Sequence, residues 1–164
     1  MKKIILTVSF IFIFACTAFS QQISRNALGL RLGDSDGFGA EISYQRGIFG
    51  NNNRLEFGLG WRDADDFNAF RLTGLYQWVY QLDGNFNWYV GAGGGFGNVD
   101  PDDDNVLLAD EDSEFFGFVA GNIGIEYNFE IPLLISLDFR PEIGFSDYVD
   151  DFDFDIAIGI RYQF

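Results

Sequence analysis

The 164-residue sequence predicts an all-β fold, a closed antiparallel barrel of eight strands with up-and-down connections. Three observations support this prediction: apolar and polar residues alternate in eight runs, turn-forming residues separate the runs, and aromatic residues gather at the ends of the runs. The final run, residues 155–164, shows the alternation most clearly. Ile156, Ile158 and Ile160 fall on one face of it, and Arg161 falls on the other.

Residues 1–20 have the features of a cleaved signal peptide. Lys2 and Lys3 provide a positive start, residues 4–14 form an apolar stretch, and a small-residue cleavage site ends at Ser20. The apolar stretch is too short to cross a membrane comfortably as a helix. We therefore expect the chain to be exported and these residues to be removed.

The barrel is expected to be a single domain over residues 21–164, because the length is that of one domain and no linker interrupts the runs. Cys16, the one cysteine in the sequence, leaves lipidation at a lipoprotein cleavage site open as an alternative. If cleavage occurs after Ser20 instead, the mature chain has no cysteine. It then has neither a disulfide nor thiol chemistry.

The eight runs follow one another without a helical period or an internal repeat. They cover residues 27–33, 38–45, 55–62, 70–80, 87–96, 115–129, 133–145 and 155–164. Turn-forming and acidic residues are frequent in the connections, at residues 34–37, 47–53, 63–68, 82–85, 97–113, 130–132 and 146–153. The Asp-Gly pair within residues 82–85 is a strong hairpin signal. Pro141 predicts a bulge or a local break in the seventh run, because proline has no N–H for the ladder.

The polar face of the strands is predicted to line the interior of the barrel. It is rich in glycine and poor in lysine and threonine, which suits a crowded lumen better than a solvated surface. Its charges balance, and we expect them to form a paired network, because an unpaired buried charge costs on the order of several kcal/mol. The predicted network consists of Arg31, Arg62, Arg71, Arg140 and Arg161 with Glu41, Glu56, Glu126, Asp138 and Glu142.

The apolar face is predicted to contact lipid, because aromatic residues gather at both ends of the strands, as in the two girdles of a membrane barrel. One rim would hold Tyr44, Trp78, Tyr80, Trp88, Tyr127, Phe129, Tyr162 and Phe164, and the other Phe38, Trp61, Phe70, Phe96, Phe115, Phe145 and Phe154. The runs have about the 9–11 residues that a tilted transmembrane strand needs. Closure is required, because an open edge in lipid leaves unpaired N–H and C=O groups. A soluble, secreted, lipocalin-like barrel with an apolar ligand inside is the alternative.

Over residues 21–164 the chain resembles the small eight-stranded outer-membrane β-barrel proteins of the OmpA/OmpX type, which are porin-like barrels. The sharpest local match is Gly159, Tyr162 and Phe164, which resemble the terminal signal that the outer-membrane assembly machinery reads. Ala157 departs from that signal, which usually has a polar residue there. The resemblance implies a monomer in the bacterial cell outer membrane. It also implies contact with outer-membrane lipid and lipopolysaccharide, and assembly by that machinery.

Composition excludes several classes of function. The formal net charge of −15 argues against nucleic-acid binding, which requires a basic surface. The sequence has no histidine, so Ser-His-Asp triads and histidine bases are unavailable. The outer-membrane barrel enzymes that act on lipid A or phospholipid depend on histidine with serine, and the chain lacks that feature. We therefore expect a structural or interaction protein and not an enzyme, with a narrow ion channel as an alternative.

The acidic connection at residues 97–113 contains a candidate calcium site. Asp100, Asp102, Asp104 and Glu111 occupy the first, third, fifth and twelfth positions of a calcium-loop template. Asn105 replaces the usual glycine, and strands flank the loop where the template has helices. The alternative is a solvated acidic loop, which would face outside the cell if both termini lie in the periplasm. No other cofactor is predicted.

Deleting Phe164 should lower the yield of barrel in outer membranes more than it lowers the stability of barrel that has already folded, because the residue belongs to the assembly signal. Immunoblots of purified outer membranes measure the yield, and urea unfolding of refolded barrel measures the stability. Equal yields from the full-length and truncated chains would refute the role of Phe164 in assembly.

Overall fold

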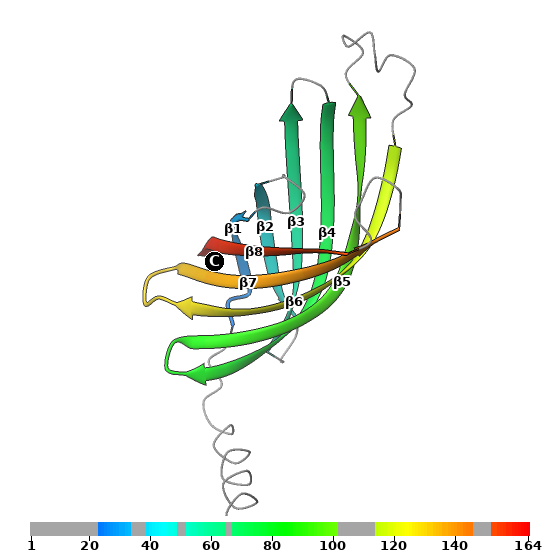
Figure 1. Cartoon of the computed structure of the whole chain (residues 1–164). Coiled ribbons are helices and arrows are strands. Elements are labelled where there is room, and N and C mark those ends of the chain that lie inside the picture. The colour runs from blue at the N-terminus through cyan, green and yellow to red at the C-terminus, as the bar shows by residue number, and fades with distance from the viewer. Residues whose placement is uncertain (1–22, 34–38, 49–51, 65–66, 102–113, 146–151) are drawn as a thin grey trace, which may run out of the picture.

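The computed structural model describes residues 23–33, 39–48, 52–64, 67–101, 114–145 and 152–164. Eight strands form one closed antiparallel barrel, in which each strand pairs with its neighbours in the chain and β8 pairs with β1. Figure 1 shows the strands in chain order around the wall, with the end of β8 beside β1. The prediction of a closed, eight-stranded, up-and-down barrel is confirmed.

The strands differ in length, so the wall is taller on one side. They are β1 (Asn26–Leu32), β2 (Ala40–Ile48), β3 (Asn53–Ala64), β4 (Phe67–Asp83), β5 (Phe86–Pro101), β6 (Glu114–Asn128), β7 (Leu133–Gly144) and β8 (Asp153–Gln163). Strand β4 has 17 residues and β5 has 16, whereas β1 has 7. Figure 1 shows β3, β4, β5 and β6 extending beyond the shorter strands β1 and β2.

Two connections are shorter than the sequence predicted. Residues 63–68 were expected to connect two strands, but β3 and β4 pair as far as Ala64 and Phe67. The connection expected to begin at residue 97 begins after Pro101, because β5 continues its pairing with β4 up to the Phe67–Pro101 pair. Val99 lies opposite Ala69 and packs against buried apolar residues of the interior. This packing, together with the pairing to β4 and β6, favours a strand at residues that the sequence analysis assigned to a connection.

Strand β8 illustrates how alternation orients the wall. Ile156, Ile158 and Ile160 expose 61%, 50% and 45% of their surface. Ala157, which lies between two of them, and Arg161, which follows Ile160, are each 1% exposed. Because side chains of a strand alternate across the sheet, one face points outward and the other into the barrel. The same alternation occurs in the other strands, so the outer wall is apolar.

Two local predictions are also confirmed. The β4–β5 connection is a tight hairpin in which Gly84 has a φ of 50°, a left-handed conformation that favours glycine. At Pro141 the strand itself continues, but the β6–β7 pairing stops at Glu142 and resumes at Phe139 in the same register. The proline therefore lies in a gap in the ladder, as expected from its missing N–H.

The interior also contains an apolar cluster that the alternation of polar residues did not predict. Leu75, Phe116, Phe118 and Ala120 are buried together on the inner faces of β4 and β6. The neighbouring strand β5 has glycine at inward positions, and the Phe118 ring covers one of them: a Cβ at Gly95 would lie 2.5 Å from Phe118 Cζ. Glycines in β5 therefore make room for the aromatic rings of β6.

Gly95→Ala should destabilise the barrel by about 1–3 kcal/mol, because the new methyl group would collide with the Leu72 carbonyl oxygen, lie 2.5 Å from Phe118 Cζ and overpack the interior. Gly117→Ala is the matched control, since a Cβ at Gly117 meets nothing closer than the Gly95 carbonyl oxygen at 3.9 Å. It should leave stability nearly unchanged. Equilibrium urea unfolding in lipid vesicles compares the two variants, and equal midpoints would contradict the close packing at Gly95.

Candidate functional site

The barrel interior contains a set of buried charged side chains. Among the described residues they are Arg31, Arg54, Arg71, Arg140, Arg161, Glu41, Glu56, Glu126, Asp138, Glu142 and Asp155, each exposing 3% or less of its surface. Seven of the eight strands contribute, because these residues occupy inward positions of the alternation. Strand β5 contributes the neutral polar side chains of Asn87 and Tyr89.

Glu56 accepts hydrogen bonds from side chains on three other strands. Arg161 Nη2 lies 3.0 Å from Oε1, and Ser43 Oγ donates to the same oxygen at 3.1 Å. Gln45 and Gln77 donate to Oε2 at 2.8 and 2.9 Å. A buried carboxylate with this many donors is satisfied as an anion, so Glu56 is a structural acceptor.

Arg161 is held in one orientation by three partners besides its own strand. In addition to Glu56, its Nε donates to Ser43 Oγ and its Nη1 to Ser136 Oγ, both at 2.8 Å. Gly159 lies two residues earlier on the same face, and a Cβ there would collide with Arg161 Nη1 and Ser136 Oγ. Packing inside the barrel therefore explains why this position of the C-terminal pattern is a glycine.

Arg31 occupies the centre of a second group. Its Nη2 lies 2.7 Å from Asp138 Oδ1 and its Nη1 lies 2.5 Å from Asp155 Oδ2. Glu41 lies 3.7 Å from Arg31 and 3.0 Å from Arg140, so it connects the two arginines. Asp155 was not among the residues predicted for the network, although it shares the inward face of β8 with Arg161.

Arg54 was also missed by the sequence analysis. Its Nη2 lies 2.7 Å from Glu126 Oε2, its Nε donates to Gln77 Oε1 at 2.6 Å, and its guanidinium stacks 4.8 Å from the centre of the Tyr89 ring. Asn87 donates to the other oxygen of Glu126 at 3.2 Å. The alternation in the sequence could have identified it, because Arg54 lies two residues before Glu56 and therefore on the same face of the strand.

The remaining predicted network residues are Arg71, Glu142 and Arg62. Arg71 forms an ion pair with Glu142 and lies 4.2 Å above the centre of the Phe118 ring. Arg62 belongs to β3 and pairs with Ala69, but its side chain lies outside the described part of the structure. The apolar cluster therefore meets the charged groups at Phe118.

Three of the other predicted site residues, Tyr162, Phe164 and Asp100, lie at or next to the ends of strands. Tyr162 and Phe164 are 60% and 61% exposed on the outer wall, with ring centres 6.3 Å apart. Asp100 belongs to β5 opposite Asn68, whereas Asp102, Asp104 and Glu111 lie outside the described residues, so the calcium site stays a prediction. Within the described residues, no group of three or more carboxylate, histidine or cysteine side chains is placed to hold a metal.

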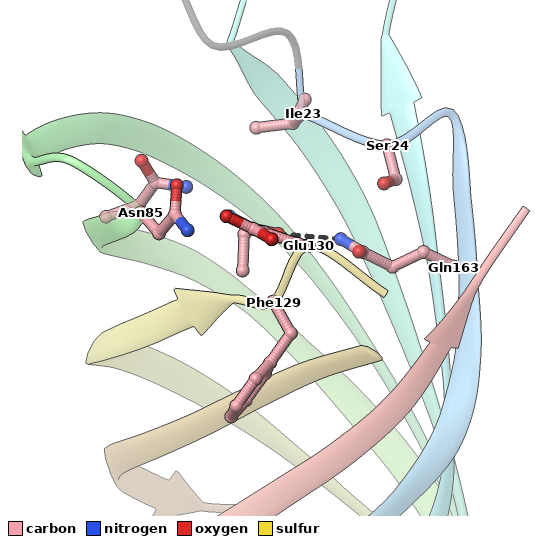
Figure 2. Close-up of a pocket in the computed structure, with 8 residues that line it drawn as sticks. Ile23, Ser24, Asn85, Phe129, Glu130 and Gln163 are labelled. Carbon is pink, nitrogen blue, oxygen red and sulfur yellow. Dashed lines mark hydrogen bonds between the residues drawn. The ribbon is translucent and has the colours of Figure 1, made fainter. Parts of the chain in front are cut away.

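The interior opens at the end of the barrel where β1 begins and β8 ends, which we call the turn end. A cavity of about 340 Å³ lies there, lined by Ile23, Ser24, Asn85, Asn87, Asn128, Phe129, Glu130 and Gln163. Figure 2 shows the polar side chains around this opening and the Phe129 ring directed away from it. Four of the same residues also line a much smaller cavity of about 10 Å³, which Arg54 and Glu126 border as well. The Arg54–Glu126 pair therefore lies below the opening.

Replacing Glu56 by alanine should destabilise the barrel by about 3–5 kcal/mol, because Arg161 would remain buried without its anion. Arg161→Ala should have a similar effect. The double variant should lose less unfolding free energy than the two single variants lose together, and the difference, the coupling energy, should be about 0.5–3 kcal/mol. Equilibrium unfolding in lipid vesicles measures all three variants.

A control cycle combines Arg161→Ala with Glu142→Ala, whose ion pair is with Arg71. These two substitutions should be additive within about 0.5 kcal/mol. Additivity in the Glu56 cycle as well would show that the Glu56–Arg161 contact is not a specific interaction.

Three solved structures are similar to this chain. The N-terminal β-barrel domain of OprF from Pseudomonas aeruginosa is 11% identical with a TM-score of 0.62, covering 85% of this chain and 95% of that one. Neisserial surface protein A (NspA) is 14% identical with a TM-score of 0.57, covering 85% and 94%. Ail, the attachment invasion locus protein of Yersinia pestis, is 16% identical with a TM-score of 0.57, covering 86% and 97%.

No protein-family model matches the sequence, and no curated protein matches it either. No helix among the described residues is long and apolar enough to cross a membrane. At 11–16% identity the similarity concerns the fold. The chain has the fold of the small eight-stranded outer-membrane β-barrels.

Proposed function

We propose that this protein is an integral barrel of the bacterial outer membrane, with a lumen filled by side chains and a structural or interaction role. The observation that supports this most strongly is the reversed distribution of polarity. Large apolar side chains cover the outside of all eight strands, whereas the interior contains the paired charges. In a soluble protein the charged side chains would face water and the apolar ones would be buried.

The apolar outer wall is too extensive for a protein surrounded by water. Ile42, Ile123 and Leu137, on three separate strands, are each about half exposed, at 52%, 48% and 50%. Exposed apolar surface that continues over whole strands marks a site of contact with membrane or another protein. A band that encircles a closed barrel fits a bilayer, since lipid surrounds the barrel on every side.

Aromatic pairs at both ends of the outer wall also support insertion into a bilayer. At the turn end, the Tyr80 and Trp88 rings stack with centres 4.8 Å apart. Towards the opposite end, Phe96 and Phe115 stack with centres 5.7 Å apart. Membrane barrels have such girdles at the two interfaces, where aromatic rings lie at the level of the headgroups.

The outer membrane is the compartment that fits the sequence. The signal-like residues 1–20 imply export, and Gly159, Tyr162 and Phe164 resemble the terminal assembly signal of outer-membrane barrels. Ail, one of the structurally similar proteins, is an outer membrane protein. The partners that follow from this location are outer-membrane lipid, lipopolysaccharide and the assembly machinery, with the barrel as a monomer. The acidic connection after β5, at residues 102–113, would then face outside the cell.

A catalytic role has little support in the interior, because its carboxylates are occupied by arginine and amide donors. A soluble barrel with an apolar ligand would need an apolar lumen, and the described interior is lined mainly by polar and charged side chains. The second candidate is a narrow ion channel. The 340 Å³ opening at the turn end favours it, because this opening brings solvent close to Arg54 and Glu126.

Cell fractionation followed by gel electrophoresis with and without boiling tests the membrane location. We expect recovery with outer membranes and a folded band that shifts on heating, because a closed barrel resists detergent until it is boiled. Recovery in the soluble periplasmic fraction without detergent would contradict the proposal.

Conductance across planar bilayers separates a filled barrel from a channel. A silent bilayer is expected, because eight strands leave an interior that side chains can fill. Steady, discrete openings from purified barrel would favour the channel, and heat-denatured protein controls for leaks caused by detergent.

A further inference from the structure

Positive charge is scarce on the outside of the barrel. Among the described side chains that are not buried in the lumen, the basic ones are Arg25 and Arg46, and both are exposed. They lie at the turn end on adjoining segments: Arg46 pairs across the sheet with Asn26, and the Arg25 carbonyl oxygen accepts the Gly47 N–H at 2.9 Å. In a chain of net charge −15, two exposed arginines at one place stand out. We call Arg25, Arg46, Asn26 and Tyr44 the arginine rim.

The Arg46 side chain lies on the outer wall. It shares the outward face of β2 with Ile42, which is 52% exposed, and with Tyr44. Asn26 Oδ1 accepts hydrogen bonds from Arg46 Nη1 at 3.2 Å and from the Tyr44 hydroxyl at 2.9 Å. A neutral amide thus holds the guanidinium beside an aromatic ring of the girdle, and no carboxylate among the described residues pairs with it. The guanidinium of Arg46 has five N–H donors in a planar arrangement, and most of them stay available to an anion.

The two aromatic rims differ in chemistry. At the turn end the outward aromatic residues include several with polar tips, namely Tyr44, Tyr76, Trp78, Tyr80, Trp88, Tyr127 and Tyr162. At the opposite end the exposed aromatics are Phe70, Phe96, Phe115, Phe145, Phe152, Phe154 and Trp61. Hydrogen-bond donors on the outer wall therefore concentrate at the rim that also has the arginines. The surface at this rim suits headgroups rich in acceptors, such as phosphates and ester carbonyls.

We propose that the arginine rim binds the phosphodiester group of a phospholipid in the periplasmic leaflet of the outer membrane. This inference rests on the proposed membrane location and orientation. The phosphate would accept from Arg46, with exposed Arg25 adding positive charge at the same rim, and the acyl chains would lie along the outer faces of β1, β2 and β3. Leu28, Ile42 and Phe57 provide that apolar surface, each 45–52% exposed. Arginine is suited to this task, because its planar fork matches two phosphate oxygens.

The combination of an outward arginine with a continuous apolar wall selects this occupant over others. Lipopolysaccharide would lie at the opposite rim, where the outward aromatics are mainly phenylalanine and the sequence of the connection at residues 102–113 is acidic. Free inorganic phosphate offers the same oxygens but no acyl chains, so it would not use the apolar wall. The proposed site requires both the phosphate and the two chains.

Native mass spectrometry of the purified, folded barrel tests the site with three probes: phosphatidylglycerol, diacylglycerol with the same acyl chains, and inorganic phosphate. The wild-type barrel should retain phosphatidylglycerol in preference to diacylglycerol. Arg46→Gln should weaken phosphatidylglycerol binding about fivefold, the effect of one cation near a lipid phosphate. Arg46→Lys should keep part of the preference, and Arg25→Gln combined with Arg46→Gln should remove it.

Asn53→Ala is the matched control, because Asn53 is an uncharged residue of β3 that pairs with Ile48 at the same rim. It should bind phosphatidylglycerol as the wild type does. Equal binding by wild type and Arg46→Gln would overturn the proposal, and so would complete displacement of phosphatidylglycerol by inorganic phosphate. A heat-modifiable gel band verifies that each variant is folded. Because the assay uses purified barrel, a negative result leaves the fractionation test of membrane location unaffected.

Discussion

The pairing of buried charges inside a closed wall is the constraint on which the rest of this barrel depends. Eleven charged side chains among the described residues occupy a lumen that is almost inaccessible to water, so each needs a counter-charge or several donors. Glu56 meets this need with an arginine, two amides and a hydroxyl, and Arg31 does so with two aspartates. Contacts such as Arg31–Asp138 join strands that do not neighbour each other in the wall. The network therefore adds cross-links through the interior to the hydrogen bonds of the ladder.

The space for this network comes from small residues in the wall. Gly159 leaves room for the Arg161 guanidinium, and Gly95 leaves room for the Phe118 ring. The Phe118 ring in turn lies beneath Arg71, so the apolar cluster and the ion pairs share one surface. The glycines of the inward face thus act as part of the packing, which explains why that face contains long arginines and aromatic rings beside residues without side chains.

The outside of the barrel is organised by depth. Aliphatic residues such as Ile158 and Leu137 occupy the middle of the wall, and aromatic residues occupy its ends. The turn end differs from the opposite end, because it combines tyrosine and tryptophan with Arg25, Arg46 and the polar opening at Glu130. This asymmetry gives the molecule two chemically distinct ends, which is what insertion across two unlike leaflets would require.

The sequence by itself determined the number of strands, their order around the barrel and the face of each that points inward. These follow from a period of two and from turn chemistry, which are local properties. The sequence could not assign partners, because Arg31 meets Asp138 across 107 residues and only closure of the barrel brings them together. Arg54 and Asp155 were overlooked although the period of two places both on inward faces. The Phe116–Phe118 cluster was not predictable in this way, because its place depends on register and on space left by glycines of another strand. The tertiary structure decided these contacts, since strand curvature and register set which inward side chains meet across the lumen.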